Sequence, residues 1–344
     1  MTRDIEIRGI RIFAKASACA HACAYCLIGP KKLTELPFPR FNALAERFIE
    51  WRNEKPNPPP HVLIGFEDSY EFDVEILAGL FHLYKKLGWD DEGMSVKLGG
   101  LRMRTEAEMH DWLLTRRDVA GLKVAHASLA GYGTIHDQWN RRERDFDFLY
   151  NAMRDAVGLG LKVNQRIFIS RSTIASIDKL VLELDKITPN AHRYLSTFVY
   201  SGFATRLEAE RITEEDRDRL PSSVAALPRR SGDNWLSERE WISTRSDLVS
   251  DRSTRSVTLS LEVNERNIDR LESMQCEEII AKLAEQTRQA YATLPSRSEL
   301  FEKYADPSNR CIYASMDEIE RKWFDAYRRD YNFDVAKGLT HLAA

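Results

Sequence analysis

The chain has 344 residues, a net charge of −3, and 43% hydrophobic and 30% charged residues, which is the composition of an ordinary folded globular protein. Lysine and arginine alternate with aspartate and glutamate along the chain, which argues against the basic face of a nucleic-acid-binding protein. No stretch approaches the roughly 18 apolar residues of a membrane span. Charges close to the N-terminus exclude the apolar core of a secretory signal peptide. We therefore expect a cytoplasmic protein without a nucleic-acid or membrane partner.

Apolar patterns predict six strands in the first two thirds of the chain, at 9–16, 61–65, 95–98, 123–129, 161–169 and 193–200. Helical patterns follow these strands at 39–53, 72–88, 105–116, 146–159 and 174–187. A further helical stretch begins near Thr213. Strands that alternate with helices form a parallel sheet covered by helices, and six units indicate an open barrel rather than a closed eight-stranded one. The predicted fold is α/β, a partial (β/α)6 TIM-like barrel over residues 1–215.

Residues 216–344 are expected to form a C-terminal α/β extension that packs on the barrel. Its first part, about 221–256, is rich in Ser, Arg, Pro and Asp and has little periodicity, which is typical of a linker or surface excursion. A strand is predicted at 257–263. Helical patterns complete the chain at about 274–293, 297–304 and 315–330.

The five cysteines are unevenly placed, because three of them stand in a C-x3-C-x2-C pattern at Cys19, Cys23 and Cys26. Clustered thiols in a reducing compartment indicate a metal site rather than disulfides. The spacing suits a loop wrapped around an iron–sulfur cluster, and three ligands rather than four would leave one iron open to chelate a cofactor. Tyr25, directly before the last cysteine, would supply an aromatic wall.

Zinc is the main alternative at this loop. Three cysteines with His21 could form a Cys3His site, but His21 lies between two of the cysteines, whereas structural zinc ligands come as two separated pairs. A fourth ligand would otherwise come from Cys276, Cys311 or a distant histidine. Two other functions therefore stay open: a zinc-stabilised binding protein and a plain electron-transfer iron–sulfur protein.

The segment CAHACAYC at 19–26 resembles the signature of the radical S-adenosylmethionine (SAM) superfamily, with Tyr25 at a position where that family commonly has an aromatic residue. The resemblance implies a [4Fe-4S] cluster on the three cysteines. It implies that the cluster, once reduced by a flavodoxin- or ferredoxin-type electron donor, cleaves SAM. It also implies the fold, since the family has a six-stranded partial barrel.

A second motif follows the second predicted strand. The segment GFED at 65–68 resembles the family's Gly-Gly-Glu-Pro turn, although Phe66 and Asp68 depart from that pattern. The resemblance implies that Gly65, through its backbone, and Glu67 contact the amino group of the methionine moiety of SAM.

The segment SLAGYGTIHDQWNRR at 128–142 is similar to the fourth-strand exit in the branch that includes molybdenum cofactor and peptide-modifying enzymes. The resemblance implies a 5'-deoxyadenosyl radical that abstracts hydrogen from a substrate C–H bond, with a peptide or protein as the first candidate substrate. A small metabolite or nucleotide is the alternative, and the reaction type, whether oxidoreductase, mutase or epimerase, is left open. Many relatives carry a cysteine-rich SPASM-type tail for auxiliary clusters, but here Cys276 and Cys311 stand alone.

Period-two alternation selects the side chains that face the barrel lumen. On the fourth strand Val124, His126 and Ser128 share one face, and on the fifth strand Asn164, Arg166 and Ser170 share another. A buried arginine needs a partner because an unpaired charge is costly. We therefore assign Ser128 and Arg166 to the SAM carboxylate or ribose. The alternatives are an ion pair between Arg166 and a structural carboxylate such as Glu183, and a core role for His126.

Catalytic residues are not resolved by the sequence, which offers only weak candidates. A thiol can in principle donate a hydrogen atom to a substrate radical, so Cys276 and Cys311 are candidates, and the alternative is that both are buried structural cysteines. His136 is a candidate for orienting the substrate, and Asp137 for capping a turn. The basic cluster Arg141, Arg142 and Arg144, interrupted by Glu143 and Asp145, is expected to form a solvated or substrate-facing loop.

Overall fold

The computed structural model describes residues 4–15, 19, 21–27, 34–55, 60–67, 71, 73–88, 94–188, 192–244 and 254–331. Its strands are β1 (Asp4–Lys15), β2 (His61–Glu67), β3 (Met94–Lys97), β4 (Leu122–Leu129), β5 (Lys162–Phe168), β6 (His192–Ser196), β7 (Leu236–Ser237), β8 (Thr254–Glu262) and β9 (Ile312–Tyr313). Its first helices are α1 (Phe38–Asn53), α2 (Val74–Lys86), α3 (Glu106–Ala120), α4 (Thr134–Asn140), α5 (Asp145–Gly158) and α6 (Ile177–Ile187). They are followed by α7 (Glu214–Asp218), α8 (Ser222–Ala225), α9 (Glu238–Thr244), α10 (Ile268–Ser273), α11 (Cys276–Thr293), α12 (Arg297–Tyr304) and α13 (Met316–Tyr331). Single 3-10 turns lie at η1 (Ile174–Ser176), η2 (Gly202–Arg206) and η3 (Glu208–Glu210).

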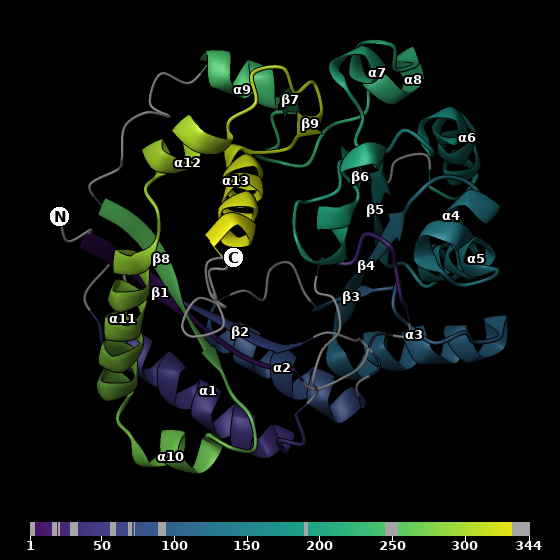
Figure 1. Cartoon of the computed structure of the whole chain (residues 1–344). Coiled ribbons are helices and arrows are strands. Elements are labelled where there is room, and N and C mark those ends of the chain that lie inside the picture. The colour runs from purple at the N-terminus through teal and green to yellow at the C-terminus, as the bar shows by residue number, and fades with distance from the viewer. Residues whose placement is uncertain are drawn as a thin grey trace.

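The strands form two parallel sheets, ordered β2-β1-β8 and β3-β4-β5-β6, and a small antiparallel pair of β7 with β9. Helices α1, α2 and α11 cover the first parallel sheet, whereas α3, α5 and α6 cover the second (Figure 1). The predicted α/β fold with six strand–helix units and a partial barrel is therefore confirmed. Within the described ranges β2 and β3 are not paired, so the barrel sheet is divided there.

Alternation along β4 separates its two faces. Ala125, Ala127 and Leu129 are fully buried towards the helices that cover the sheet. Ser128, on the opposite face, is half-buried and lies beside Arg166 of β5 in the parallel register. Arg166 in turn lies beside Tyr194 of β6. Because neighbours in a parallel register share a face, these three side chains form one row across the lumen side of the sheet.

The ends of α3 are specified locally. Thr105 and Glu108 form a reciprocal capping box at the start of the helix, which satisfies two backbone N–H groups that have no helical partner. Gly121 ends the helix with φ at +68°, a left-handed conformation that favours glycine. The helix is thereby held directly before β4.

The position of the late strand differs from the expectation for the C-terminal extension. The predicted strand at 257–263 is β8, which joins the barrel sheet beside β1 in a register that runs from Asp4 opposite Thr254 to Phe13 opposite Glu262, with a shift between Ile7 and Gly9. At the junction with β2, a Cβ on Gly9 would lie 2.2 Å from the His61 carbonyl oxygen, so only glycine permits this approach. The chain after residue 215 thus contributes a strand to the barrel, and the domain division at 215 stays a prediction.

The segment predicted as a linker at 221–256 contains regular structure in its described part. It holds α8, β7 and α9, and β7 pairs with β9. The elements are short, so they produce little periodicity over a sequence window. Among the helices of the described ranges, none combines the length and apolar character needed to cross a bilayer.

Candidate cluster and cofactor site

The cysteine loop follows directly after β1, with Cys19 exposed and Cys23 and Cys26 half-buried. Burial and the neighbouring thiols of Cys19 and Cys26 raise the pKa of Cys23 to about 12. No three His, Cys, Asp or Glu side chains of the described ranges are placed to hold a single ion. A cubane cluster makes a different demand, because each of its cysteine thiolates binds a separate iron.

Two glycines allow other segments to approach this loop closely. Gly202, after β6, has φ at +56°, and a Cβ there would lie 2.5 Å from the Cys26 carbonyl oxygen. The same carbonyl accepts a hydrogen bond from the N–H of Phe203 at 2.8 Å. Gly100, after β3, has φ at +95°, and a Cβ there would lie 2.8 Å from Cys19 Sγ. The exits of β3 and β6 therefore form a close-fitting cradle around the cysteines.

Tyr25 is buried in an aromatic cluster at the ends of β5 and β6. Its ring centroid lies 4.6 Å from that of Phe168 and 5.4 Å from that of Phe198. Its hydroxyl donates to Asn140 Oδ1 at 2.6 Å, and burial raises the pKa of Tyr25 well above its usual value. The expected aromatic wall beside the last cysteine is present, whereas a contact between Tyr25 and SAM stays a prediction.

A fully buried carboxylate, Asp145, lies at the centre of a network that the sequence did not reveal. It accepts hydrogen bonds from Arg142 Nε at 2.9 Å and Asn140 Nδ2 at 2.5 Å. His136 Nε2 lies 3.1 Å and His21 Nε2 3.4 Å from its oxygens. Burial opposes ionisation, but the hydrogen bonds from His136 and His21 outweigh burial and hold the pKa of Asp145 well below its ordinary range.

The expectation that residues 141–145 form a solvated or substrate-facing loop is therefore wrong for Asp145 and Arg142. Asp145 is fully buried, and the Arg142 side chain is 13% exposed and also donates to the Leu101 carbonyl. The only local sign of this network was an acidic residue among arginines at the start of a helix, which more often indicates a solvated helix end. His136, Asn140 and Arg142 come from α4 and the turn after it, whereas His21 comes from the cysteine loop, and a single sequence does not show that these two segments meet.

The two residues of the His-Asp pair at the fourth-strand exit differ in burial, since Asp137 is only half-buried. His136 is fully buried, and its Nδ1 accepts the N–H of Ala130 at 3.0 Å. Asp137 accepts the N–H groups of Arg144 and Phe146, both at 2.8 Å, and so caps the start of α5. Asp137 thus has the capping role that the sequence offered, and a role for His136 in orienting a substrate stays a prediction.

Arg166 points into the lumen and has no carboxylate partner among the described residues. Its Nη2 donates to Ser196 Oγ at 2.8 Å, and its guanidinium carbon lies 4.3 Å from the centre of the Phe168 ring. Its Nε is buried without a hydrogen-bond partner in the described chain, and burial lowers the pKa of the group. Glu183 is not that partner, because it binds Lys186 at 2.8 Å, but Asp233 acts electrostatically on Arg166, so a structural carboxylate stays an alternative.

The remaining lumen candidates occupy the face that alternation predicted. Ser128 and His126 are half-buried there, and burial lowers the pKa of His126. Asn164 of β5 lies beside His126 in the register. Ser170 does not follow this face, because it lies beyond the end of β5 in a buried turn, where its N–H donates to Thr173 Oγ1 at 2.8 Å.

The GFED segment begins within β2, which is an edge strand of its sheet. Gly65 lies opposite Phe13 of β1, and Glu67 is the last residue of the strand. The Phe66 side chain, which departs from the family pattern, is buried against α1, with ring centroids 5.2 Å from Phe38 and 5.0 Å from Phe41. It therefore leaves the lumen side clear. The Glu67 side chain and Asp68 lie outside the described residues.

The two late cysteines lie in different places. Cys276 begins α11 and is buried in the core between that helix and the sheet β2-β1-β8. Cys311 is half-buried and forms an isolated bridge with Thr213. Burial raises the pKa of both thiols. A role as hydrogen-atom donor stays a prediction for each of them.

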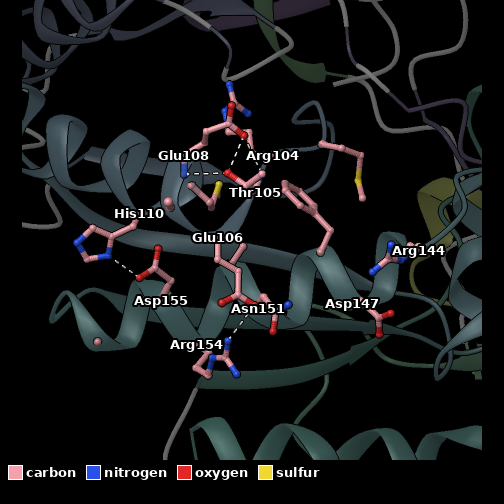
Figure 2. A pocket seen from close by; sticks show the side chains of 16 residues that line it. Arg104, Thr105, Glu106, Glu108, His110, Arg144, Asp147, Asn151, Arg154 and Asp155 are labelled. Carbon is pink, nitrogen blue, oxygen red and sulfur yellow. Dashed lines mark hydrogen bonds and ion pairs between the residues drawn. The ribbon is translucent and has the colours of Figure 1, made fainter.

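A pocket outside the barrel lies between α3 and α5 (Figure 2). Its wall contains a second histidine–aspartate pair, in which His110 Nδ1 lies 2.7 Å from Asp155 Oδ1. His110 is exposed, unlike His21. The pocket is on the helix layer and is separate from the lumen row of Ser128 and Arg166.

Neither a known family model nor a curated protein matches this chain. Among solved structures, SuiB of Streptococcus suis bound to SAM matches 75% of this chain with 11% identity and a TM-score of 0.47. This chain spans 59% of SuiB. The enzyme anSMEcpe with bound AdoMet and the Cp18Cys peptide matches 97% of this chain and 100% of its own length, with 11% identity and a TM-score of 0.49. Methylornithine synthase (PylB) matches 65% of this chain and 61% of its own, with 18% identity and a TM-score of 0.38.

The likeness is distant in each case, so the assignment of function depends on the site. The residues present fit a cluster and SAM in two respects. The cysteine loop turns back on itself, with the Cys26 N–H 3.1 Å from the Cys23 carbonyl oxygen, and Gly100 and Gly202 allow their segments to pack closely on it. Arg166 Nε is buried without a hydrogen-bond partner in the described chain.

Proposed function

We propose that this chain is a radical SAM enzyme that holds a [4Fe-4S] cluster on Cys19, Cys23 and Cys26. When bound, the cluster supplies the electron that cleaves SAM, and the 5'-deoxyadenosyl radical so released removes hydrogen from a substrate C–H bond. The observation that carries the proposal is the close approach of the β3 and β6 exits to the cysteine loop: a Cβ on Gly100 would lie 2.8 Å from Cys19 Sγ, and a Cβ on Gly202 would lie 2.5 Å from the Cys26 carbonyl oxygen. Three protein ligands would leave one iron open to chelate a cofactor.

The roles of the chain's own residues follow from their chemistry. Arg166 would bind the SAM carboxylate through its unsatisfied Nε, since a charge-assisted hydrogen bond compensates the buried charge. Ser128, next to it in the register, would add a neutral hydrogen bond. Gly65 and Glu67, at the end of β2, would receive the amino group. The buried rings of Tyr25 and Phe168 would exclude water from the reacting centre.

The substrate belongs to the same proposal. We take a peptide or protein as the substrate because residues 128–142 are similar to the fourth-strand exit of peptide-modifying enzymes, and a small metabolite or nucleotide is the alternative. A flavodoxin- or ferredoxin-type protein in the cytoplasm would supply the electron. In the zinc alternative His21 would be the fourth ligand, since its Nδ1 lies 3.5 Å from Cys23 Sγ, and the metal content of the purified protein distinguishes the two functions.

Anaerobic reconstitution tests the proposal. The purified chain should take up iron and sulfide, turn brown, and release 5'-deoxyadenosine from SAM when it is reduced. Replacing the three cysteines together by alanine should abolish iron binding. The matched controls Cys276→Ala and Cys311→Ala should keep both the iron and the SAM cleavage. A triple variant that retains its iron, or a wild-type protein that binds only zinc, would refute the proposal.

A further inference from the structure

A second row of polar side chains crosses the lumen side of the sheet β3-β4-β5-β6. In the parallel register its four members are neighbours, in the order Lys97, His126, Asn164 and His192. The residues next to them along each described strand are buried on the opposite face, so all four side chains face the lumen. Because side chains on one face repeat every second residue, the second row lies about 7 Å from the lumen row of Ser128 and Arg166, towards the strand starts.

Three members of the second row are open to the lumen. His126 and Asn164 are half-buried, and His192 is exposed, with its ring centroid 5.7 Å from that of Tyr194. No hydrogen bond or ion pair joins the side chains of these three residues to another described residue. Their N–H groups therefore remain available to a ligand, whereas the interior of a barrel is usually filled by apolar packing.

The charge on this face of the sheet is basic. Lys97, Lys162 and Arg166 all lie on it, and strands β3, β4, β5 and β6 contain no aspartate or glutamate. On the opposite sheet, Glu262 is paired with Lys15 at 2.8 Å. The carboxylates that the structure places near the second row therefore do not neutralise it.

The surroundings of His126 show the same excess of positive charge. Burial lowers the pKa of His126, and the charges of Lys97 and His192 lower it further. Asp233, which acts on Arg166 in the lumen row, is not among these influences. An anion bound between the two histidines would act in the opposite direction, because it favours the protonated ring.

We propose that the second row binds an anionic group of the substrate, a carboxylate or a phosphate, through His126, Asn164 and His192 beside the positive charge of Lys97. This inference rests on the proposed function, because it takes the bound anion to be part of the molecule from which hydrogen is removed. N–H donors on neighbouring side chains, together with a nearby cation, are groups that recognise oxyanions. A peptide substrate would present an acidic side chain or its terminal carboxylate, and a small metabolite its carboxylate or phosphate.

The test is nuclear magnetic resonance of the histidine rings in the full-length chain before reconstitution. The protein is titrated with sodium phosphate or sodium acetate, and sodium chloride keeps the ionic strength constant. The chain has 8 histidines, and the variants His126→Leu and His192→Leu identify the two relevant signals. At least one of the two anions should shift both signals in a saturable manner and raise the pKa of His126. Tighter binding of phosphate would indicate a phosphorylated substrate, and tighter binding of acetate a carboxylate.

The sharpest variant is Asn164→Asp, which places a negative charge in the middle of the row with almost no change of shape. It should weaken anion binding by about tenfold or more, because like charges repel at close range. Asn164→Leu removes only a neutral donor and should weaken binding by about two- to tenfold. The matched control is His110→Leu, which removes an exposed histidine outside the barrel and should leave the response unchanged.

Signals of His126 and His192 that respond to neither anion would overturn the inference, and so would an equal response in Asn164→Asp. Either result would leave iron binding and SAM cleavage as they are, so it is distinct from a failure of the proposed function. A chain that binds the anion but takes up no cluster would refute the proposed function, and with it the assignment of this site to the substrate.

Discussion

Two carboxylates, Asp145 and Glu238, are both completely buried, yet they connect to different parts of the molecule. Glu238, at the start of α9, accepts from Trp323 Nε1, Asn309 Nδ2 and Lys322 Nζ, each at 2.6 Å. All of these donors belong to the last segments of the chain. Asp145 is equally well satisfied, but one of its contacts, His21, continues to a cysteine of the proposed cluster.

The comparison shows that burial and full hydrogen bonding do not by themselves indicate function. Any buried carboxylate must be paired, because desolvation of an unpaired charge is costly. What distinguishes Asp145 is the next contact of its partner. We therefore infer that the Glu238 network joins α9 to the C-terminal segments and has a structural role, whereas the Asp145 network supports the proposed cluster.

The difference between the two networks is tested most directly by removing each carboxylate separately. Asp145→Ala and Glu238→Ala each leave buried donors without an acceptor and should cost roughly 3 to 5 kcal/mol of unfolding free energy. Only Asp145→Ala should also change the cluster, with less iron bound or an altered resonance signal. Chemical denaturation and iron analysis on the same samples separate the two effects. Equal iron loss in both variants would mean that the two networks do not differ in function.

The glycine cradle gives the next largest effect. Gly202→Ala would place an alanine in a left-handed conformation, with its Cβ 2.4 Å from the Leu27 carbonyl oxygen. This clash is with backbone, which cannot move aside as a flexible side chain can. Strain of about 1 kcal/mol and overpacking of about 1 to 3 kcal/mol should displace the cysteine loop. Iron content after reconstitution should fall sharply. The control is Gly232→Ala, where φ is also positive, at +86°, but no atom lies within 4 Å of the added Cβ. This variant should have only the backbone strain and should keep its iron.

Much of this architecture could be predicted from local patterns. The sequence pattern predicts that Ala125 and Ala127 face one side of β4 and Ser128 the other, and the tight cysteine spacing predicts a metal-binding loop. The place of β8 beside β1 could not be predicted, because the pairing of two strands so distant in sequence depends on which edge the preceding helices leave open. The requirement for glycine at position 202 could not be predicted either, because it arises from the close approach of the Cys26 carbonyl group in a distant loop.

The cofactor assignment predicts a third effect. Arg166→Ala removes a charge-assisted hydrogen bond worth roughly 1.5 to 3 kcal/mol, so SAM should bind about one to two orders of magnitude more weakly. Iron content should be unchanged because Arg166 is not a ligand. Arg166→Lys keeps the charge but loses the planar fork and should fall between wild type and Arg166→Ala. SAM titration of the reconstituted, anaerobic protein measures all three, and unchanged affinity in Arg166→Ala would return this arginine to a purely structural role.

The smallest effect concerns Ser128, beside Arg166 in the register. Ser128→Ala removes one neutral hydrogen bond, worth roughly 0.5 to 1.5 kcal/mol, so the affinity for SAM should fall by about two- to tenfold. The contribution should depend on Arg166, because both groups would act on the same carboxylate or ribose. The double variant should therefore lose less affinity than the product of the two single losses, as neighbouring residues that share a partner do. Strict multiplication of the two effects would place Ser128 and Arg166 on separate parts of SAM, and an unchanged affinity in Ser128→Ala would leave Arg166 as the one cofactor contact of the lumen row.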